Sequence, residues 1–172
     1  DILFAIDTSL SMSTEDVQPN RLSRAKLAIL DFVGQLSGDR VGLLPFAGSA
    51  FLLCPLTVDY LAFEESLQAV DTSIIPQQGT NLAGAIRAAE AVLHNDANHK
   101  ILILITDGES LQGDGISAAE EAATRDMTVF TVGVGTPAGE LIPVQHNGRR
   151  EFIKDEGGNF VVSKLDEATL RA

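Results

Sequence analysis

Three oxygen-bearing side chains occupy alternate positions directly after the first apolar stretch of the chain. They are Asp7, Ser9 and Ser11 in the run D-T-S-L-S. In an extended loop, alternate side chains point to the same side, so these oxygens would share one face. Carboxylate and hydroxyl oxygens are hard ligands that suit Mg²⁺ or Mn²⁺, whereas zinc prefers His and Cys. The alternative interpretation is that the two serines satisfy loop backbone groups and that Asp7 caps a turn.

Two more segments carry side chains that would complete such a site. Thr80 stands in Q-G-T-N-L, where its hydroxyl could cap the following predicted helix or face the sheet, and Asp107 stands in I-T-D-G-E after an apolar run. Together the three segments supply two carboxylates and three hydroxyls. The octahedral shell of Mg²⁺ needs more oxygens than these, so water or an outside ligand must provide the rest. We predict that a carboxylate of a partner protein completes the shell.

The elements around these residues are expected to bring them together. The apolar runs at 2–6 and 101–105 are typical of central parallel strands that are covered on both faces. Strands that alternate with helices favour an α/β domain with a mostly parallel sheet, in which ligands bind at the carboxyl ends of the strands. Asp7 and Asp107 follow the two most hydrophobic strands, so both should lie at this edge.

Periodicity and turn residues predict the remaining elements. A short link makes the strand at 50–54 antiparallel to its predecessor and places it at a sheet edge. Asn147-Gly148 lies between two short apolar runs and predicts a small β-hairpin insertion near 136–157, outside the main sheet. The predicted strands span 2–6, 41–46, 50–54, 100–105, 128–134 and 159–162. The predicted helices span 21–36, 60–70, 81–93, 116–124 and 166–170.

The composition favours an ordinary globular domain. The chain has 172 residues, of which 45% are hydrophobic and 21% charged, so we expect a single domain over 1–172. Its net charge of −12 argues against nucleic acid and anionic membrane surfaces as partners and favours cations or basic partners. Cys54 is the only cysteine, which rules out an internal disulfide, and we expect it to be buried.

Several charged residues carry a weaker signal. Glu15 and Asp16 are expected to be solvated, and Glu109 is expected to lie on a loop surface. Arg149 and Arg150 are expected on the surface of the hairpin, where they could orient an acidic partner in this acidic domain.

The sequence contains no motif of a common nucleophilic or nucleotide-hydrolysing enzyme: it has no G-x-S-x-G, no Cys-His constellation and no Walker loop. We therefore favour a noncatalytic, metal-dependent protein-interaction module. One alternative is a Mg²⁺-dependent phosphoryl-transfer hydrolase in which an Asp is the nucleophile. Another is a metal-independent structural scaffold.

The three segments together resemble the metal-ion-dependent adhesion site (MIDAS) of von Willebrand factor A (VWA) domains. D-T-S-L-S matches its D-x-S-x-S motif, Thr80 matches its threonine, and I-T-D-G-E matches its second aspartate segment. The resemblance covers nearly the whole chain. It implies a Rossmann-like three-layer sandwich, with helices on both faces of the sheet and one short antiparallel edge strand. It also implies Ser9, Ser11 and Thr80 as direct ligands, Asp7 and Asp107 as ligands directly or through water, and Mg²⁺ or Mn²⁺, rather than Ca²⁺, as the ion.

Other stretches are similar to the bacterial Bat proteins, the aerotolerance-operon branch of this family. They include D-R-V-G-L-L-P-F-A-G-S-A, V-G-T-P-A-G-E-L-I-P-V and V-S-K-L-D-E-A-T-L. This resemblance implies a domain anchored in the bacterial inner membrane by transmembrane segments outside this sequence, and facing the periplasm. It implies assemblies with sibling Bat proteins, tetratricopeptide-repeat (TPR) proteins and a MoxR-type AAA+ ATPase. The chain lacks an initiator Met and opens inside a strand, so we expect it to be part of a longer protein.

Overall fold

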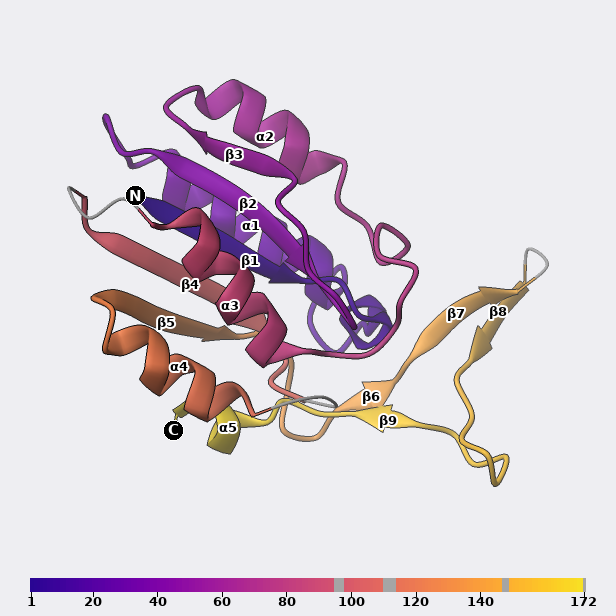
Figure 1. Cartoon of the computed structure of the whole chain (residues 1–172). Coiled ribbons are helices and arrows are strands. Elements are labelled where there is room, and N and C mark those ends of the chain that lie inside the picture. Colours follow the sequence, from indigo (N-terminus) through magenta and orange to yellow (C-terminus); the bar gives the residue numbers. More distant parts are fainter. Residues whose placement is uncertain (95–97, 110–113, 147–148, 172) are drawn as a thin grey trace.

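A mixed sheet forms the centre of the molecule (Figure 1). The computed structural model describes residues 1–94, 98–109, 114–146 and 149–171. Within these residues the sheet has five strands in the order β3-β2-β1-β4-β5. All neighbouring pairs are parallel except β2 and β3. The strands are β1 (Ile2–Asp7), β2 (Val41–Phe46), β3 (Cys54–Thr57), β4 (Lys100–Thr106) and β5 (Met127–Gly133).

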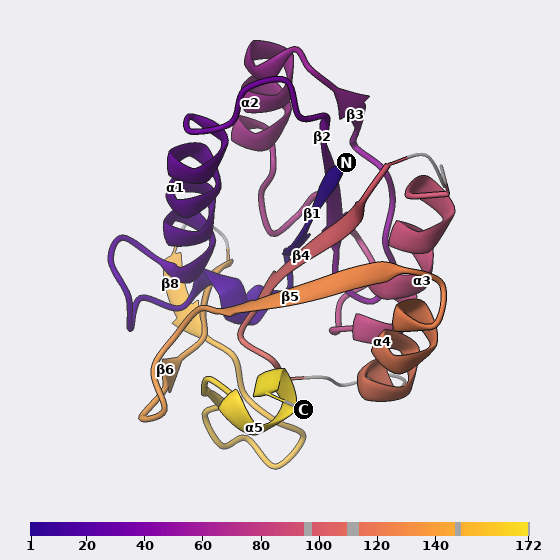
Figure 2. The ribbon, with the colours of Figure 1, turned by 90° about the vertical axis from the view of Figure 1, so that its left-hand side faces the viewer.

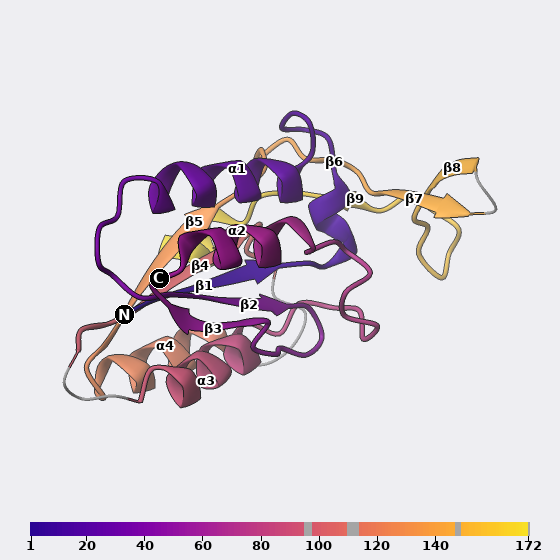
Figure 3. The same cartoon turned by 90° about the horizontal axis from the view of Figure 1, so that it is seen from above.

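Helices cover both faces of this sheet, as Figures 2 and 3 show. Two of them, α1 and α2, pack on one face, and α3 and α4 pack on the other. A short 3-10 helix, η1 (Leu10–Ser13), follows β1. The predicted three-layer α/β sandwich is therefore confirmed. The α-helices are α1 (Arg21–Val33), α2 (Tyr60–Gln68), α3 (Leu82–Val92), α4 (Gly115–Ala123) and α5 (Glu167–Arg171).

The strand β1 joins the two cores, because successive side chains of a strand point to opposite faces. Phe4 belongs to the core under α1 and α2, and Leu3 belongs to the core under α3 and α4. The Phe4 ring lies 5.8 Å from the Phe32 ring, edge to face, and 5.6 Å from the Phe63 ring. This burial on both faces explains why β1 reads as an uninterrupted apolar run.

The third strand is antiparallel and at the sheet edge, as predicted, but its predicted position at 50–54 is wrong. Regular pairing with β2 begins only at Cys54, which is buried, and the register shifts between Val41 and Leu43. Pro45 in β2 has no N–H to donate, so the segment opposite it cannot form a complete ladder. That segment makes isolated backbone hydrogen bonds to β2, such as the one from the Leu53 N–H to the Leu43 carbonyl at 2.9 Å.

The other edge strand, β5, is covered less completely than β1. Phe130 is 54% exposed and Val132 is 39% exposed. Both line an apolar groove that also includes Phe32 of α1 and Ile103 of β4. Within the described residues, the helical cover of the sheet is thus thinner over β5 than over its centre.

A hairpin insertion projects beyond the edge of the sheet where the parallel strands end (Figures 1 and 3). Its strands β7 and β8 are antiparallel, which confirms the predicted hairpin, although Asn147 and Gly148 lie outside the described residues. The strand predicted at 159–162 is displaced: it is β9, which pairs with β6 and does not join the main sheet. We call residues 136–163 the arm. Its strands are β6 (Glu140–Leu141), β7 (Pro143–His146), β8 (Arg149–Phe152) and β9 (Val162–Ser163).

None of the helices in the described residues is long and apolar enough to span a membrane.

Packing against β1 should dominate the contribution of α2 to stability. We predict that Phe63→Ala lowers the free energy of unfolding by about 3–5 kcal/mol, because it empties a fully buried site beside Phe4. Leu61→Ala on the same helix should cost less than about 0.5 kcal/mol, because Leu61 is 75% exposed. Urea unfolding of both variants measures the difference. Equal losses would show that α2 does not pack as described.

Candidate metal centre

Asp7 lies at the carboxyl end of β1, and its side chain is fully buried. The Thr106 hydroxyl donates a hydrogen bond to Asp7 Oδ2 at 2.6 Å, and the Ser9 N–H donates to Asp7 Oδ1 at 2.8 Å. These bonds arise from the topology: β1 and β4 are parallel neighbours in which Ile6 faces Ile105, so the next residues of both strands meet. The carboxylate is thereby held in one orientation at the edge of the sheet.

The two predicted serines turn toward each other just after Asp7. Ser9 Oγ lies 2.9 Å from Ser11 Oγ, and both residues are almost completely buried. Ser11 belongs to η1, and its hydroxyl also hydrogen-bonds the Asp107 carboxylate. The alternation of Asp7, Ser9 and Ser11 in the sequence therefore becomes one cluster of oxygens.

Thr80 lies on a third loop at the same edge of the sheet. The helix cap that follows it is Asn81, not Thr80, because Asn81 Oδ1 accepts from the Gly84 N–H at 2.8 Å. The Asn81 N–H donates to the Ala47 carbonyl at 2.8 Å, which ties this loop to the residue after β2. Thr80 is buried there, with 2% of its surface exposed. Its hydroxyl is consequently not needed to cap α3.

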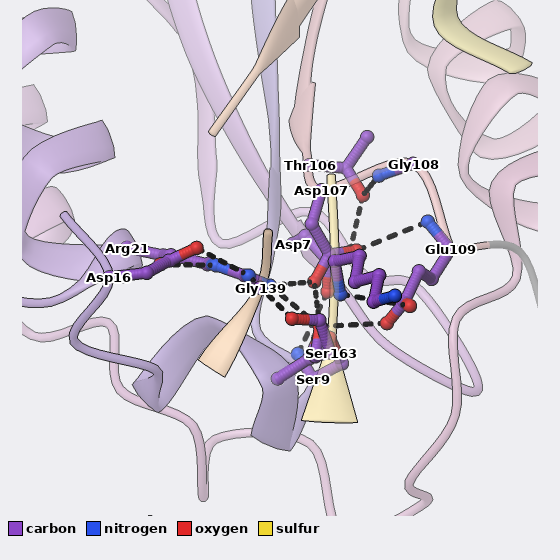
Figure 4. Close-up of polar contacts among 12 residues, drawn as sticks. Asp7, Ser9, Asp16, Arg21, Thr106, Asp107, Gly108, Glu109, Gly139 and Ser163 are labelled. Carbon is purple, nitrogen blue, oxygen red and sulfur yellow. Dashed lines mark hydrogen bonds and ion pairs between the residues drawn. The ribbon is translucent and has the colours of Figure 1, made fainter. Parts of the chain in front are cut away.

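Asp107 follows β4 and is completely buried against Arg21 (Figure 4). Arg21 Nη1 donates to Asp107 Oδ2 at 2.9 Å, and the Glu109 N–H donates to Asp107 Oδ1 at 3.2 Å. The Arg21 guanidinium is itself completely buried at the start of α1. The chain thus provides a fixed positive charge for one of its two clustered carboxylates.

The same guanidinium binds Asp16, five positions before it, and Ser163, 142 positions after it. Its Nε and Nη2 form a fork with the Asp16 carboxylate at 2.9 and 2.8 Å, and Nη1 donates to Ser163 Oγ at 2.6 Å. Gly135 makes room for it, since a Cβ there would lie 2.8 Å from Arg21 Nε, and its φ of +135° also favours glycine.

Two charged residues near the centre, Asp16 and Glu109, have hydrogen-bond partners that the sequence does not indicate, and Asp16 is not the solvated group that was expected. Asp16 is enclosed by Arg21 and by the Thr136 N–H and hydroxyl, at 2.8 and 3.0 Å from Asp16 Oδ2. Glu109 accepts from Ser163 Oγ at 2.7 Å and from the Lys164 N–H at 3.1 Å. The expectation for Asp16 is wrong because Thr136, which helps to enclose it, lies 120 positions away, where no local pattern indicates it. Glu109 lies in a loop and is partly exposed, as expected, but it also binds residues near the end of the chain.

Burial and mutual repulsion set the electrostatics of the two clustered carboxylates. Burial, with the nearby charge of Asp107, raises the pKa of Asp7 to about 7. Burial also raises the pKa of Asp107, and the hydrogen bond from Ser11 and the charge of Arg21 offset only part of that rise. Burial would raise the pKa of Asp16 too, but hydrogen bonds from Arg21 and Thr136 outweigh it and lower that pKa. Negative charge on the two carboxylates is therefore unfavourable at this centre, and a bound cation would stabilise it.

The donor set fits a hard divalent ion. It consists of two buried carboxylates with two hydroxyls between them, and a third hydroxyl on the neighbouring loop. Nowhere in the described residues do three or more His, Cys, Asp or Glu side chains gather to hold a metal. A metal at this centre would accordingly depend on hydroxyl oxygens, which favours Mg²⁺ or Mn²⁺ over a softer ion.

Asp7 should make the metal-free domain less stable as the pH rises. The raised pKa in the folded state means that its favourable contribution is complete below pH 4 and is lost as the pH climbs through about 7. The full change is about 4 kcal/mol. We predict that Asp7→Asn flattens this part of the stability profile, measured by urea unfolding in EDTA from pH 5 to pH 8. Asp31→Asn, on the exposed side of α1, serves as the control, and an unchanged slope in Asp7→Asn would contradict the assignment.

Arg21 should be essential for the fold as well as for the centre. We predict that Arg21→Met lowers the free energy of unfolding by about 3–5 kcal/mol, because it leaves the Asp16 and Asp107 carboxylates buried without a counter-charge. Arg21→Lys should lose less, since it keeps the charge but not the two-pronged fork. Arg24→Met, on an exposed position of the same helix, should change little. Thermal unfolding that is equal for Arg21→Met and Arg24→Met would refute this role.

Comparisons with known proteins agree with this architecture. The chain is 31% identical over 187 aligned residues to a UPF0353 protein of Mycolicibacterium paratuberculosis, and the match covers 96% of this chain but 57% of that protein. The chain thus spans little more than half of the length of this relative. Among solved structures, BatB of Bacteroides thetaiotaomicron matches with a TM-score of 0.93 and 37% identity, over 99% of this chain and 82% of that one. An aerotolerance-related membrane protein of Bacteroides fragilis matches with a TM-score of 0.92 and 36% identity, over 98% and 83%.

Two more distant structures share the fold and contain a metal. A mussel byssus matrix protein with a zinc-occupied MIDAS motif has a TM-score of 0.66 and 20% identity, and the manganese-loaded TRAP protein of Plasmodium vivax has a TM-score of 0.65 and 18% identity. They cover 77% and 78% of this chain, and 37% and 57% of their own. The family model of the von Willebrand factor type A domain matches residues 2–109, which is more than half of the sequence. The chain therefore belongs to the von Willebrand factor type A family and is related to the Bat proteins.

Proposed function

We propose that this chain is a noncatalytic protein-interaction module that depends on a divalent metal ion. The observation that carries the proposal is the burial of the Asp7 and Asp107 carboxylates in one cluster with Ser9 and Ser11, at the carboxyl edge of a parallel sheet. Burying two neighbouring carboxylates is unfavourable unless a cation offsets their charge. A bound metal ion would provide that charge. The cluster, together with Thr80, would hold Mg²⁺ or Mn²⁺.

The hydrogen bonds of the chain prepare these ligands. Thr106 and the Ser9 N–H orient Asp7, while Arg21 and the Glu109 N–H orient Asp107. Ligands that are held by such outer bonds bind a metal with less loss of conformational freedom. When bound, the ion supplies a concentrated positive charge at the end of the sheet.

The charge balance of the centre favours a carboxylate as the external ligand. Arg21 pairs with both Asp107 and Asp16, so its single positive charge offsets only part of the negative charge of Asp107. A divalent ion with only two directly bound charges, and with neutral hydroxyls as its other ligands from this chain, would stay electrophilic enough to bind another anion. We infer that a partner protein supplies this anion through an Asp or Glu side chain.

The relatives suggest the cellular setting of the module. Because one matching structure is that of an aerotolerance-related membrane protein and another is BatB, we propose a Bat-type complex anchored in the bacterial inner membrane. The proposed unit is a single domain over 1–172 that faces the periplasm, with its membrane anchors outside this sequence. Its proposed partners are sibling Bat proteins, TPR proteins and a MoxR-type AAA+ ATPase.

A phosphoryl-transfer hydrolase fits the centre less well. An aspartate nucleophile must expose one oxygen to its substrate, whereas the Asp7 side chain is 0% exposed and both of its oxygens accept hydrogen bonds. A metal-independent scaffold gives no reason for two neighbouring carboxylates in the interior. Both alternatives therefore leave the arrangement of Asp7 unexplained.

Metal binding should stabilise the folded domain. We predict that Mg²⁺ or Mn²⁺ at about one hundred times its dissociation constant adds about 2.7 kcal/mol, which corresponds to a rise of roughly 5–10 °C in the melting temperature. Asp7→Ala should abolish the rise, because it removes a ligand carboxylate, whereas Asp31→Ala on the surface of α1 should preserve it. Differential scanning calorimetry with and without EDTA provides the measurement.

Two results would count against the proposal. If neither ion shifts the melting temperature of the native domain, the metal-dependent function is wrong. If the domain hydrolyses generic phosphoesters with Mg²⁺ and loses this activity in Asp7→Asn, the hydrolase becomes the better interpretation.

A further inference from the structure

We propose that Ser163, at the base of the arm, is a positioning residue for the metal ligand Asp107, and that its hydroxyl couples metal binding to the attachment of the arm. The inference rests on the proposed function, because Asp107 is there a ligand of the ion. It goes further by assigning a role to a residue outside the three ligand segments and by making the arm respond to the metal.

The Ser163 side chain is buried among three charged groups (Figure 4). Arg21 Nη1 donates to Ser163 Oγ at 2.6 Å, and the same oxygen lies 2.7 Å from Glu109 Oε2 and 3.3 Å from Asp107 Oδ2. A hydroxyl can accept one hydrogen bond and donate another at the same time. Ser163 therefore accepts from the cation and presents its proton to the two carboxylates. One hydroxyl thus bridges the guanidinium and both acidic side chains that follow β4.

This hydroxyl completes a closed set of contacts at one oxygen of the metal ligand. Arg21 Nη1 also donates to Asp107 Oδ2, at 2.9 Å, so that nitrogen, that oxygen and the Ser163 hydroxyl form a triangle. Without the hydroxyl, Glu109 would lose a donor and Arg21 would lose an acceptor. Both side chains would then have to readjust around Asp107. Outer partners of this kind hold metal ligands in place, and their loss typically weakens metal binding by about 10- to 100-fold.

The backbone that follows Ser163 is attached directly to the loop that carries Asp107. The Asp166 N–H donates to the Asp107 carbonyl at 2.8 Å. Gly108, with a φ of +82°, allows the two segments to approach closely, since a Cβ there would lie 2.7 Å from the Asp166 carbonyl oxygen. A shift of Asp107 would therefore move residues 163–166 with it.

The other end of the arm is attached to the same guanidinium. The Thr136 N–H and hydroxyl donate to Asp16 Oδ2, and Asp16 pairs with Arg21. The Leu165 N–H donates to the Thr136 carbonyl at 3.0 Å, which joins the two ends of the arm. A metal ion that fixes Asp107 would thus stabilise the attachment of the arm at both ends. Because coupling between two such events is reciprocal, loosening the base of the arm must weaken metal binding by the same factor.

The first test measures Mn²⁺ affinity by electron paramagnetic resonance, which detects the free ion. Ser163→Ala removes the hydroxyl without adding volume and should weaken Mn²⁺ binding by about tenfold. Ser163→Thr keeps a hydroxyl and should retain most of the affinity. Ser163→Val has nearly the shape of Ser163→Thr without the hydroxyl, so it should lose as much as Ser163→Ala. The control Ser66→Ala removes a hydroxyl that bonds to the Ala62 carbonyl within α2, and it should bind like the native domain.

A further variant acts at the opposite end of the arm and leaves Ser163 unchanged. Thr136→Val keeps the N–H bond to Asp16 and removes only the hydroxyl bond, so it should weaken Mn²⁺ binding by less than Ser163→Ala does. The melting temperature of every variant in EDTA shows that it is folded at the temperature of the titration. A folding defect is thereby not mistaken for lost metal binding.

The second test measures amide hydrogen exchange by nuclear magnetic resonance in Mg²⁺ and in EDTA. The Lys164 and Thr136 N–H groups bond to acidic side chains of the network, and Mg²⁺ should slow their exchange by about tenfold in the native domain, the same factor as the loss of affinity. This difference should be much smaller in Ser163→Ala. The Val161 N–H, which bonds to the Ile153 carbonyl within the arm, should exchange equally with and without Mg²⁺.

The outcomes separate this inference from the proposed function. If the native domain binds Mn²⁺ and Ser163→Ala binds it equally well, the metal-dependent function stands and the role of Ser163 is wrong. Equal losses in Ser163→Thr and Ser163→Val would show that packing matters rather than the hydroxyl, and would also overturn it. If Mg²⁺ leaves the exchange of the Lys164 and Thr136 amides unchanged, the coupling to the arm is refuted. If the native domain binds no Mn²⁺ at all, the proposed function fails and this inference fails with it.

Discussion

The buried ion pair between Arg21 and Asp107 is the interaction on which the architecture of the centre depends. A carboxylate at the end of β4 and another at the end of β1 repel each other in a region without solvent, and burial raises the pKa of both. Arg21 lowers this cost for Asp107, yet it is buried itself and needs the Asp16 carboxylate as a second partner. The favourable free energy of such a network comes from complete pairing, since one missing member leaves an uncompensated buried charge.

This network also explains how parts that are distant in sequence are held in place. Arg21 begins α1, Asp107 follows β4, and Ser163 lies in β9 near the end of the chain. The Asp166 N–H donates to the Asp107 carbonyl at 2.8 Å, so the segment before α5 is attached to the same point. One guanidinium therefore links the first helix, the centre of the sheet and the base of the arm. A change in the position of Asp107 would be transmitted to all three through direct bonds.

The sequence correctly predicts those features of the fold that are determined by residues close together in the chain. The apolar run of β1 and the alternation of Asp7, Ser9 and Ser11 are local, and parallel pairing then brings Asp107 to the same edge. The third strand was placed too early because the consequence of Pro45 appears only once two strands are paired. The structural role of Arg21 was missed because its partners lie as far as 142 positions away, and a basic residue at the start of a helix ordinarily indicates solvent exposure.

Charge neutralisation and partner recognition are connected in this structure. If Asp107 lacked Arg21, the centre would present two uncompensated carboxylates, and a bound divalent ion would have little charge left for an external anion. Arg21 offsets part of the charge of Asp107, although the same guanidinium is shared with Asp16. Asp16 and Ser163 hold Arg21 in position. The same two residues anchor the arm, because Asp16 binds Thr136 and Ser163 belongs to β9. One set of bonds therefore holds both the Arg21 guanidinium at the centre and the base of the arm in place.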